Sequence, residues 1–212
     1  MGSVGLLFVG AVLFINGVML LGWVDARSAA PMNFFVGGLQ IITPTYLIFT
    51  AGGDPNVILA ASGLYLFSFT YLYVALNITL GLDSSGLGYF CLFVFLSALV
   101  FSWLNFTRFA DPGFGVIWLH WAFLWLLFFL LLGLKQDRIG RYTGAVCAIQ
   151  GWVTAWLPAL LLLTGGYQQF AGTVAVALAV FGVVVYGGLY VVLGRGSDAA
   201  PVAPAGDRSV PA

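Results

Sequence analysis

The sequence predicts an all-α integral membrane protein with seven transmembrane helices. Of its 212 residues, 62% are hydrophobic and only 7% are charged, a composition outside the range of soluble globular domains. Seven apolar stretches are each long enough to cross roughly 30 Å of hydrocarbon as a helix. They are also too long and too uniformly apolar for the strands of an outer-membrane barrel. The stretches are residues 4–23, 31–51, 58–80, 87–107, 113–134, 141–164 and 169–193.

The few basic residues predict how these helices are oriented, because cytoplasmic loops carry an excess of Lys and Arg. With the amino terminus outside, six of the seven basic residues fall on the cytoplasmic side and only Arg108 falls outside. The six are Arg27, Lys135, Arg138, Arg141, Arg195 and Arg208. A transmembrane domain is therefore expected over 1–193, followed by a cytoplasmic tail over 194–212. The tail is rich in Ala, Pro and Gly and is expected to be disordered.

The first two segments carry a polar stripe and a pair of glycines. Val9, Leu13 and Asn16 share one helix face by their i, i+4, i+7 spacing. An asparagine at membrane depth either bonds a neighbouring helix or lines a polar path, and the sequence leaves both alternatives open. In the second segment, Gly37 and Gly38 are expected to let another backbone approach closely.

The third segment joins aromatic side chains to an amide. Phe69, Tyr73 and Asn77 recur every four residues and share a face. The fourth segment has no comparable stripe and is interpreted as outer scaffold. Cys91, and Cys147 in the sixth segment, are expected to be small packing residues and not a disulfide.

The fifth and sixth segments carry the most distinctive pattern. Trp118, Trp121 and Trp125 fall on one helix face, and Gln150 and Thr154 on one face of the next helix. A rigid aromatic slot beside an amide suits a flat, uncharged solute that forms hydrogen bonds and passes in single file. Aromatic stripes on membrane helices are more often packing elements or belts at the headgroups, so this alternative stays open.

His120 and the seventh segment are interpreted as structural. His120 lies about 200° around its helix from Trp118, which predicts a buried imidazole bonded to a neighbouring helix and not a member of the path. The seventh segment is rich in small residues and lacks charge. It is expected to be an added scaffold or a contact between protomers.

The odd helices end alike, with Leu-Gly followed by an aspartate just before the next helix begins. These aspartates are Asp25, Asp83 and Asp137, which are 58 and 54 residues apart. The spacing favours three two-helix hairpins, repeated in parallel orientation around a central pore, with the seventh helix added at the carboxyl end.

The placement of charge excludes several classes of protein. All seven acidic and all seven basic residues fall in loops or the tail, whereas intramembrane ionisable groups mark proton relays and ion pathways. A neutral solute moving passively is therefore favoured over ion or proton coupling. The only lysine, Lys135, lies at a helix end, which excludes a retinal Schiff base. No catalytic residues, cofactor or metal site are expected, and neutral net charge argues against nucleic acid.

Three further stretches are distinctive: MNFFVGGL at 32–39, FTYLY at 69–73 with Asn77 and Gly81-Leu82-Asp83, and TAWLP at 154–158. They resemble the UreI/AmiS family of urea channels and short-chain amide transporters. The resemblance spans the first six segments. It implies a hexameric ring of protomers in the bacterial inner membrane, each protomer with its own channel, and a functional link to a cytoplasmic amidase.

The resemblance also implies a set of pore positions, and most of them coincide with the stripes described above. Leu124 is added by the resemblance alone and is equally well explained by packing. Asn77 and Thr154 come from the stripes. The complete expected path is Val9, Leu13, Asn16, Phe69, Tyr73, Asn77, Trp118, Trp121, Leu124, Trp125, Gln150 and Thr154.

Three departures bear on the expected function. Gln150 stands where the acid-activated urea channel has a glutamate, and the outer loops 52–56 and 108–113 are short and lack histidine, so acid gating is not expected. The seventh segment agrees better with the amide-transporter branch. The sequence thus predicts a passive channel for acetamide, propionamide, formamide and urea. The alternative is a seven-helix scaffold or sensor subunit that transports nothing.

Overall fold

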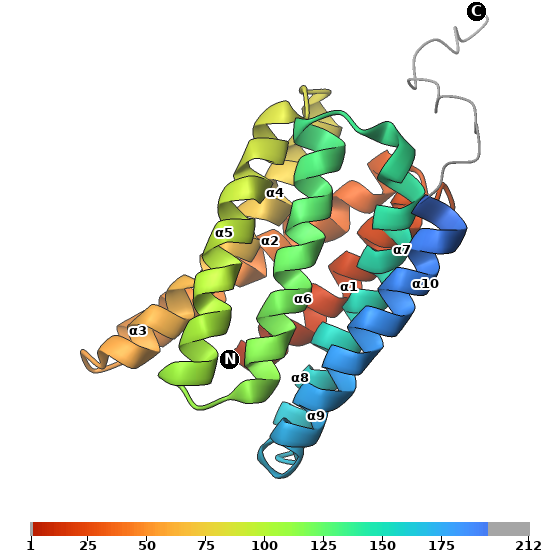
Figure 1. Cartoon of the computed structure of the whole chain (residues 1–212). Coiled ribbons are helices and arrows are strands. Elements are labelled where there is room, and N and C mark those ends of the chain that lie inside the picture. Colours follow the sequence, from red (N-terminus) through yellow and green to blue (C-terminus); the bar gives the residue numbers. More distant parts are fainter. Residues whose placement is uncertain (1, 195–212) are drawn as a thin grey trace, which may run out of the picture.

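The computed structural model describes residues 2–194, and every regular element in that range is a helix (Figure 1). Seven helical spans are long and apolar enough to cross a membrane, which confirms the predicted fold class. The predicted disordered tail lies outside the described residues, apart from Gly194. The first four spans are α1 (Gly2–Leu20), α2 (Ala26–Phe49), α3 (Pro55–Ser62) with α4 (Leu64–Leu80), and α5 (Ser85–Thr107). The fifth is α6 (Pro112–Phe128) with η1 (Phe129–Gly133), and the sixth consists of η2 (Asp137–Ile139), α7 (Gly140–Gln150), η3 (Gly151–Trp156) and α8 (Leu157–Leu163). The seventh consists of α9 (Tyr167–Phe181), η4 (Gly182–Tyr186), α10 (Gly187–Leu189) and η5 (Tyr190–Gly194).

Aspartates begin several of these helices. The Asp25 carboxylate accepts the backbone N–H of Arg27 at the start of α2. Asp54 and Asp111 act similarly at the opposite end of the molecule, each followed by a proline in the first helical turn. A carboxylate there satisfies backbone N–H groups that the helix leaves free and complements the helix dipole.

The first six spans form a closed ring, because each packs against the next and α7 returns to α1. The most extensive packing joins different hairpins, namely α2 with α4, α5 with α6, and α1 with α7 and η3. Glycines make these seams close. A β-carbon at Gly37 would lie 2.7 Å from the Leu72 side chain, and one at Gly88 would overlap the Gly133 backbone. Gly38 faces open space, so the expectation of a close approach is wrong for that residue.

The seventh span packs outside the ring against α6 and α7, along the right of Figure 1. His120 on α6 reaches it with both ring nitrogens: Nδ1 is 2.8 Å from the Tyr186 hydroxyl and Nε2 is 3.0 Å from the Leu178 carbonyl. The predicted structural role of His120 is confirmed. Cys91 and Cys147 are both buried and free, as expected.

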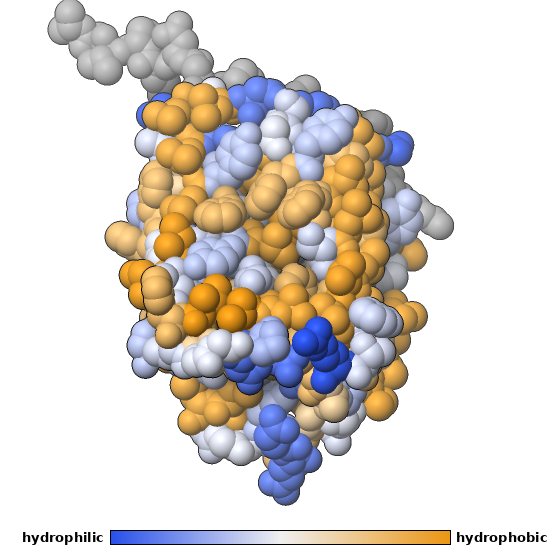
Figure 2. Space-filling model, turned by 90° about the vertical axis from the view of Figure 1, so that its left-hand side faces the viewer, coloured by the Kyte–Doolittle hydropathy of each residue, from blue (hydrophilic) through white to orange (hydrophobic). Residues whose placement is uncertain are grey.

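The outer surface suits a bilayer. On the face formed by α3, α4 and α5, hydrophobic residues cover most of the middle, and strongly hydrophilic residues gather near the two ends (Figure 2). Large side chains such as Phe93, Trp103 and Phe69 are at least half exposed there. Such exposure is favourable in lipid and indicates that the ring turns its apolar surface toward the membrane.

Candidate permeation path

Two cavities lie inside the ring. The first, here called the vestibule, has a volume of about 440 Å³ and opens toward the amino terminus. It is lined by Gly2, Ser3, Leu6, Leu47, Val57, Ala60, Ala61, Leu64, Phe101, Asn105, Phe109, Asp111, Phe114, Trp118, Trp121 and Leu162. The second, here called the chamber, has a volume of about 140 Å³ toward the opposite end. It is lined by Leu13, Asn16, Met19, Leu20, Thr70, Tyr71, Val74, Asn77, Ile78, Ser84, Leu87, Cys91, Trp125, Phe128 and Leu132.

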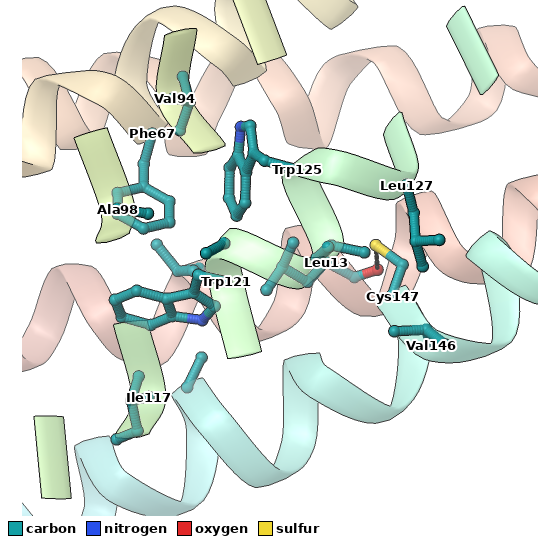
Figure 3. Close-up of a cluster of buried hydrophobic side chains, with 14 of the residues drawn as sticks. Leu13, Phe67, Val94, Ala98, Ile117, Trp121, Trp125, Leu127, Val146 and Cys147 are labelled. Carbon is teal, nitrogen blue, oxygen red and sulfur yellow. Dashed lines mark hydrogen bonds between the residues drawn. The ribbon is translucent and has the colours of Figure 1, made fainter. Parts of the chain in front are cut away.

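An aromatic cluster separates the two cavities. Phe67 of α4 presents its ring to the edges of two α6 indoles, with centroid distances of 4.8 Å to Trp121 and 5.0 Å to Trp125. Figure 3 shows these three side chains meeting near Leu13 of α1. All four are at most 2% exposed. We call Phe67, Trp121, Trp125 and Leu13 the constriction, since Trp121 lines the vestibule while Trp125 and Leu13 line the chamber.

Hydrogen bonds fix both indoles of the constriction. Trp121 Nε1 donates to the Thr154 hydroxyl at 3.0 Å, and Trp125 Nε1 donates to the Thr70 hydroxyl at 3.3 Å. The Thr154 hydroxyl, in the π-helical segment η3, in turn donates to the backbone carbonyl of Gln150 at the end of α7, at 2.7 Å. Pro158 explains that widened turn, because it has no N–H to offer the Thr154 carbonyl one turn earlier. The aromatic faces are thus held in fixed orientations.

Polar atoms without hydrogen-bond partners belong to residues that border the chamber. Among the described residues, the Asn77 side-chain oxygen and nitrogen and the Tyr71 hydroxyl are buried without hydrogen-bond partners. A polar group left this way in an apolar interior is costly, so these atoms favour a guest that bonds them. Asn16 also borders the chamber, but its amide exchanges two hydrogen bonds with Asn33 of α2, at 2.9 and 2.7 Å. Asn16 therefore bridges two helices and also borders the chamber.

The structure gathers most of the expected path residues at the ring's centre. Val9 and Leu124 are buried in the same hydrophobic core cluster as the constriction residues. Gln150 and Thr154 lie behind Trp121 and line neither cavity, with the Gln150 amide donating to the His120 carbonyl at 2.9 Å. The Gln150 side-chain oxygen is buried and has no partner in the described part of the chain.

One expected pair on α4 is placed differently. Phe69 is 50% exposed on the outer surface and stacks on Tyr65, and Tyr73 is half-buried. Phe67 and Tyr71, two residues earlier, face the constriction and the chamber instead. Both aromatic pairs have the same i, i+4 spacing, so aromaticity alone does not choose between them.

The missed face of α4 did carry a sequence signal. Thr70 and Asn77 lie seven residues apart on one face, with Val74 between them and Phe67 three residues before Thr70. This polar stripe, and not the aromatic repeat, marks the side of α4 that faces the cavities.

The interpretation of the fourth segment as outer scaffold is also wrong. Phe101 of α5 stacks on Trp118 at 4.8 Å and lines the vestibule, and Cys91 lines the chamber. Its small inward residues, Ala98 among them, make room for Phe67, as Figure 3 shows. Such residues carry no polar signal in a sequence.

A ring of apolar helices around two cavities, with a neutral aromatic constriction between them, defines a multi-pass membrane channel or transporter. The chain belongs to the AmiS/UreI family of transporters, whose family model matches residues 1–166. The resemblance found in the sequence is thereby confirmed. Because the family and its named relatives are transporters or channels, the expectation that the protein is not an enzyme is confirmed as well.

Relatives of known name agree with this assignment. The chain is 57% identical to an amidate substrates transporter protein of Mycolicibacterium smegmatis, over 79% of each chain. It is 36% identical to the acid-activated urea channel of Helicobacter pylori, over 74% of this chain and 94% of that one. The cryo-electron microscopy structure of the Helicobacter pylori urea channel in a closed state superposes with a TM-score of 0.71 at 35% identity, covering 77% of this chain and 98% of that one.

An ion pair borders the chamber, and it yields a prediction on pH. Lys135 Nζ bridges the Asp83 carboxylate at 2.9 Å and the Ser84 hydroxyl at 3.0 Å, and Ser84 lines the chamber. Hydrogen bonds from the Ser85 side chain and from Lys135 hold the pKa of Asp83 well below its usual 3.8. A lowered pKa means that this carboxylate stabilises the folded state above the usual value, and the contribution is lost only as the pH falls through the lowered one.

Transport should therefore be independent of pH between 5 and 7.5 as far as Asp83 is concerned, because the carboxylate stays charged throughout. We expect the parent and Asp83→Asn to give flat, parallel pH profiles of solute flux in proteoliposomes. Since the pair is exposed, its effect on stability should be small and should fade with salt. Acid activation that Asp83→Asn abolishes would contradict this expectation.

Proposed function

We propose that the protein is a passive channel for small neutral amides and urea, among them acetamide, propionamide and formamide. One observation carries the proposal: a constriction of fixed aromatic faces opens into a chamber where the Asn77 amide and the Tyr71 hydroxyl lack partners among the described residues. The names of the relatives, an amidate substrates transporter and a urea channel, support it.

The energetics of an amide explain why such a path is effective. The transfer of an amide from water to hydrocarbon, where it has no hydrogen-bond partners, costs about 4 to 8 kcal/mol of free energy. Flat indole and phenyl faces stack on the plane of the solute, and the Asn77 amide offers both a donor and an acceptor in place of water. The chamber, at about 140 Å³, admits a solute of a few heavy atoms. Hydrated ions meet only neutral side chains in the constriction and would have to shed water there.

Passive, ungated conduction follows from the same residues. Phe67, Trp121, Trp125 and Leu13 do not titrate, and Gln150 behind them is neutral. Neither proton coupling nor acid gating through these groups is therefore proposed. The buried Gln150 oxygen could still bond a passing amide if Trp121 moves aside, which keeps Gln150 in the proposed path.

We further propose that residues 1–193 form one channel domain and that protomers assemble as a homohexamer in the bacterial inner membrane. The broad apolar outer surface supports lipid and protomer contacts, and the basic residues support an outer amino terminus and a cytoplasmic carboxyl terminus. A cytoplasmic amidase that consumes the entering solute would keep the gradient directed inward.

The decisive experiment is stopped-flow uptake of acetamide, urea and glycerol into proteoliposomes at pH 5 and pH 7.5. Fast amide uptake that does not saturate and is equal at both pH values supports an ungated channel. Uptake only at pH 5 would contradict the ungated mechanism. No uptake above that of empty liposomes would favour the non-transporting scaffold.

Replacing Asn77 by leucine, a side chain of similar size, should slow acetamide flux by about tenfold, because the chamber loses a hydrogen-bond donor and an acceptor. Asn56→Leu is the matched control, since Asn56 is exposed in the first turn of α3, where its side-chain oxygen accepts a hydrogen bond from Arg108. Both variants should elute like the parent on size exclusion. Equal flux in Asn77→Leu and the parent would remove Asn77 from the path.

A further inference from the structure

Several hydrogen bonds attach the seventh span to the ring, and two of them end on His120. The Leu178 carbonyl can only accept a hydrogen bond, so His120 Nε2, 3.0 Å away, carries the hydrogen. In a neutral imidazole, Nδ1 is then the acceptor, and the Tyr186 hydroxyl donates to it at 2.8 Å. Gly182 leaves room for the imidazole, because a β-carbon there would lie 2.9 Å from the ring. The span is thus placed by directional bonds and not by apolar contact alone.

A chain of buried hydrogen bonds continues from this histidine to the constriction. The Gln150 side-chain amide donates to the backbone carbonyl of His120 at 2.9 Å. The Thr154 hydroxyl donates to the backbone carbonyl of Gln150 at 2.7 Å. Trp121 Nε1 completes the chain by donating to the Thr154 hydroxyl at 3.0 Å. Each of these residues, and Tyr186, is at most 7% exposed. We call this series from Tyr186 to Trp121 the relay.

We propose that the seventh span is a positioning element for the constriction, and that Tyr186 and His120 set the orientation of the Trp121 indole through the relay. The span thereby tunes which neutral solutes pass, a role that rests on the proposed function. The seventh span, Tyr167–Gly194, lies beyond the residues matched by the family model, 1–166. Tyr186 and His120 are positioning residues, since neither lines the vestibule or the chamber.

The physical basis is the scarcity of alternative partners in an apolar interior. Without Tyr186, His120 Nδ1 would be left buried and unbonded, so the α6 backbone would shift to relieve it. The His120 carbonyl holds Gln150, and Trp121 is the next residue on α6. A small movement of α6 therefore displaces the Trp121 backbone and also alters the hydrogen bonds that hold its indole.

The test uses full-length Tyr186→Phe, which deletes one hydroxyl and keeps the ring. Tyr190→Phe is the matched control, because Tyr190 lies on the same span and is 52% exposed. Tryptophans are labelled as 5-fluorotryptophan, and Trp121→Phe assigns the Trp121 fluorine resonance. We expect Tyr186→Phe to shift or broaden this resonance and Tyr190→Phe to leave it unchanged. The acetamide-to-glycerol flux ratio should fall about threefold in Tyr186→Phe only, the usual effect of one membrane-buried hydrogen bond.

A second variant separates the relay from general loosening of the fold. In a Thr154→Val background the indole end of Trp121 is already released from the relay, so adding Tyr186→Phe should shift the Trp121 resonance by less than it does in the parent background. Additive shifts, or a Trp121 resonance unchanged by Tyr186→Phe, would overturn the proposal. A parent protein without amide flux would refute the proposed function, whereas the fluorine comparison would still decide whether the relay positions Trp121.

Discussion

Replacing Trp121 by alanine is expected to lower discrimination between acetamide and glycerol by about tenfold or more, the range that one mismatched group in a fitted pocket confers. The indole lies between the vestibule and the Phe67 ring, 4.8 Å from it. Removing it joins the vestibule to the space around Phe67 and leaves the Thr154 hydroxyl without its donor. Bulkier solutes that form several hydrogen bonds then pass, while the chamber still admits the amide.

The measurement is the ratio of acetamide to glycerol permeability in proteoliposomes. Trp103→Ala is the matched control, because it is the same substitution at a residue that is 62% exposed on the outer face of α5. A buried Trp→Ala change costs about 3 to 5 kcal/mol in soluble cores, so flux is compared only in samples with parent-like elution. Equal ratios in parent and Trp121→Ala would show that the solute does not pass this indole.

Replacing Gly88 by valine is expected to abolish the folded protein. A β-carbon at Gly88 would overlap the backbone of Gly133, so α5 and α6 would have to separate along their seam. Backbone atoms have no alternative rotamer, unlike a side chain in the same place. Opening this seam also removes the contact of Phe101 with Trp118 and exposes the constriction.

Gly38→Val provides the control, since it makes the same change within a helix and a β-carbon there meets nothing within 4 Å. Fluorescence-detected size exclusion of tagged variants in mild detergent compares the two. We expect a single symmetric peak for Gly38→Val and aggregate or no peak for Gly88→Val. A normal peak for Gly88→Val would mean that the α5–α6 seam is looser than the structure describes.

Local sequence patterns were sufficient for several features of this protein. The length and hydropathy of each apolar stretch predicted seven spans, because a helix must cross a fixed thickness of hydrocarbon. The helical spacing of Trp118, Trp121 and Trp125 predicted one shared face, which the structure turns inward. The angular position of His120 separated it from that face, and it bonds the seventh span instead.

Other features depended on which helices become neighbours. The inward face of α4 carries Phe67 and Tyr71, although Phe69 and Tyr73 match them in type and spacing. The part that α5 plays at both cavities, and the position of Gln150 behind Trp121, were likewise absent from any single segment's pattern.

The sequence by itself determined how many helices cross the membrane and which of them carry polar or aromatic stripes, because these properties are local. Only the tertiary structure decided which stripe of each helix faces the centre. In water, hydropathy reveals the buried side of a helix, but in lipid both sides are apolar, so that signal is lost. Inward and outward faces are then set by close contacts between particular helices, such as Gly88 against Gly133, and by buried hydrogen bonds such as Trp121 to Thr154.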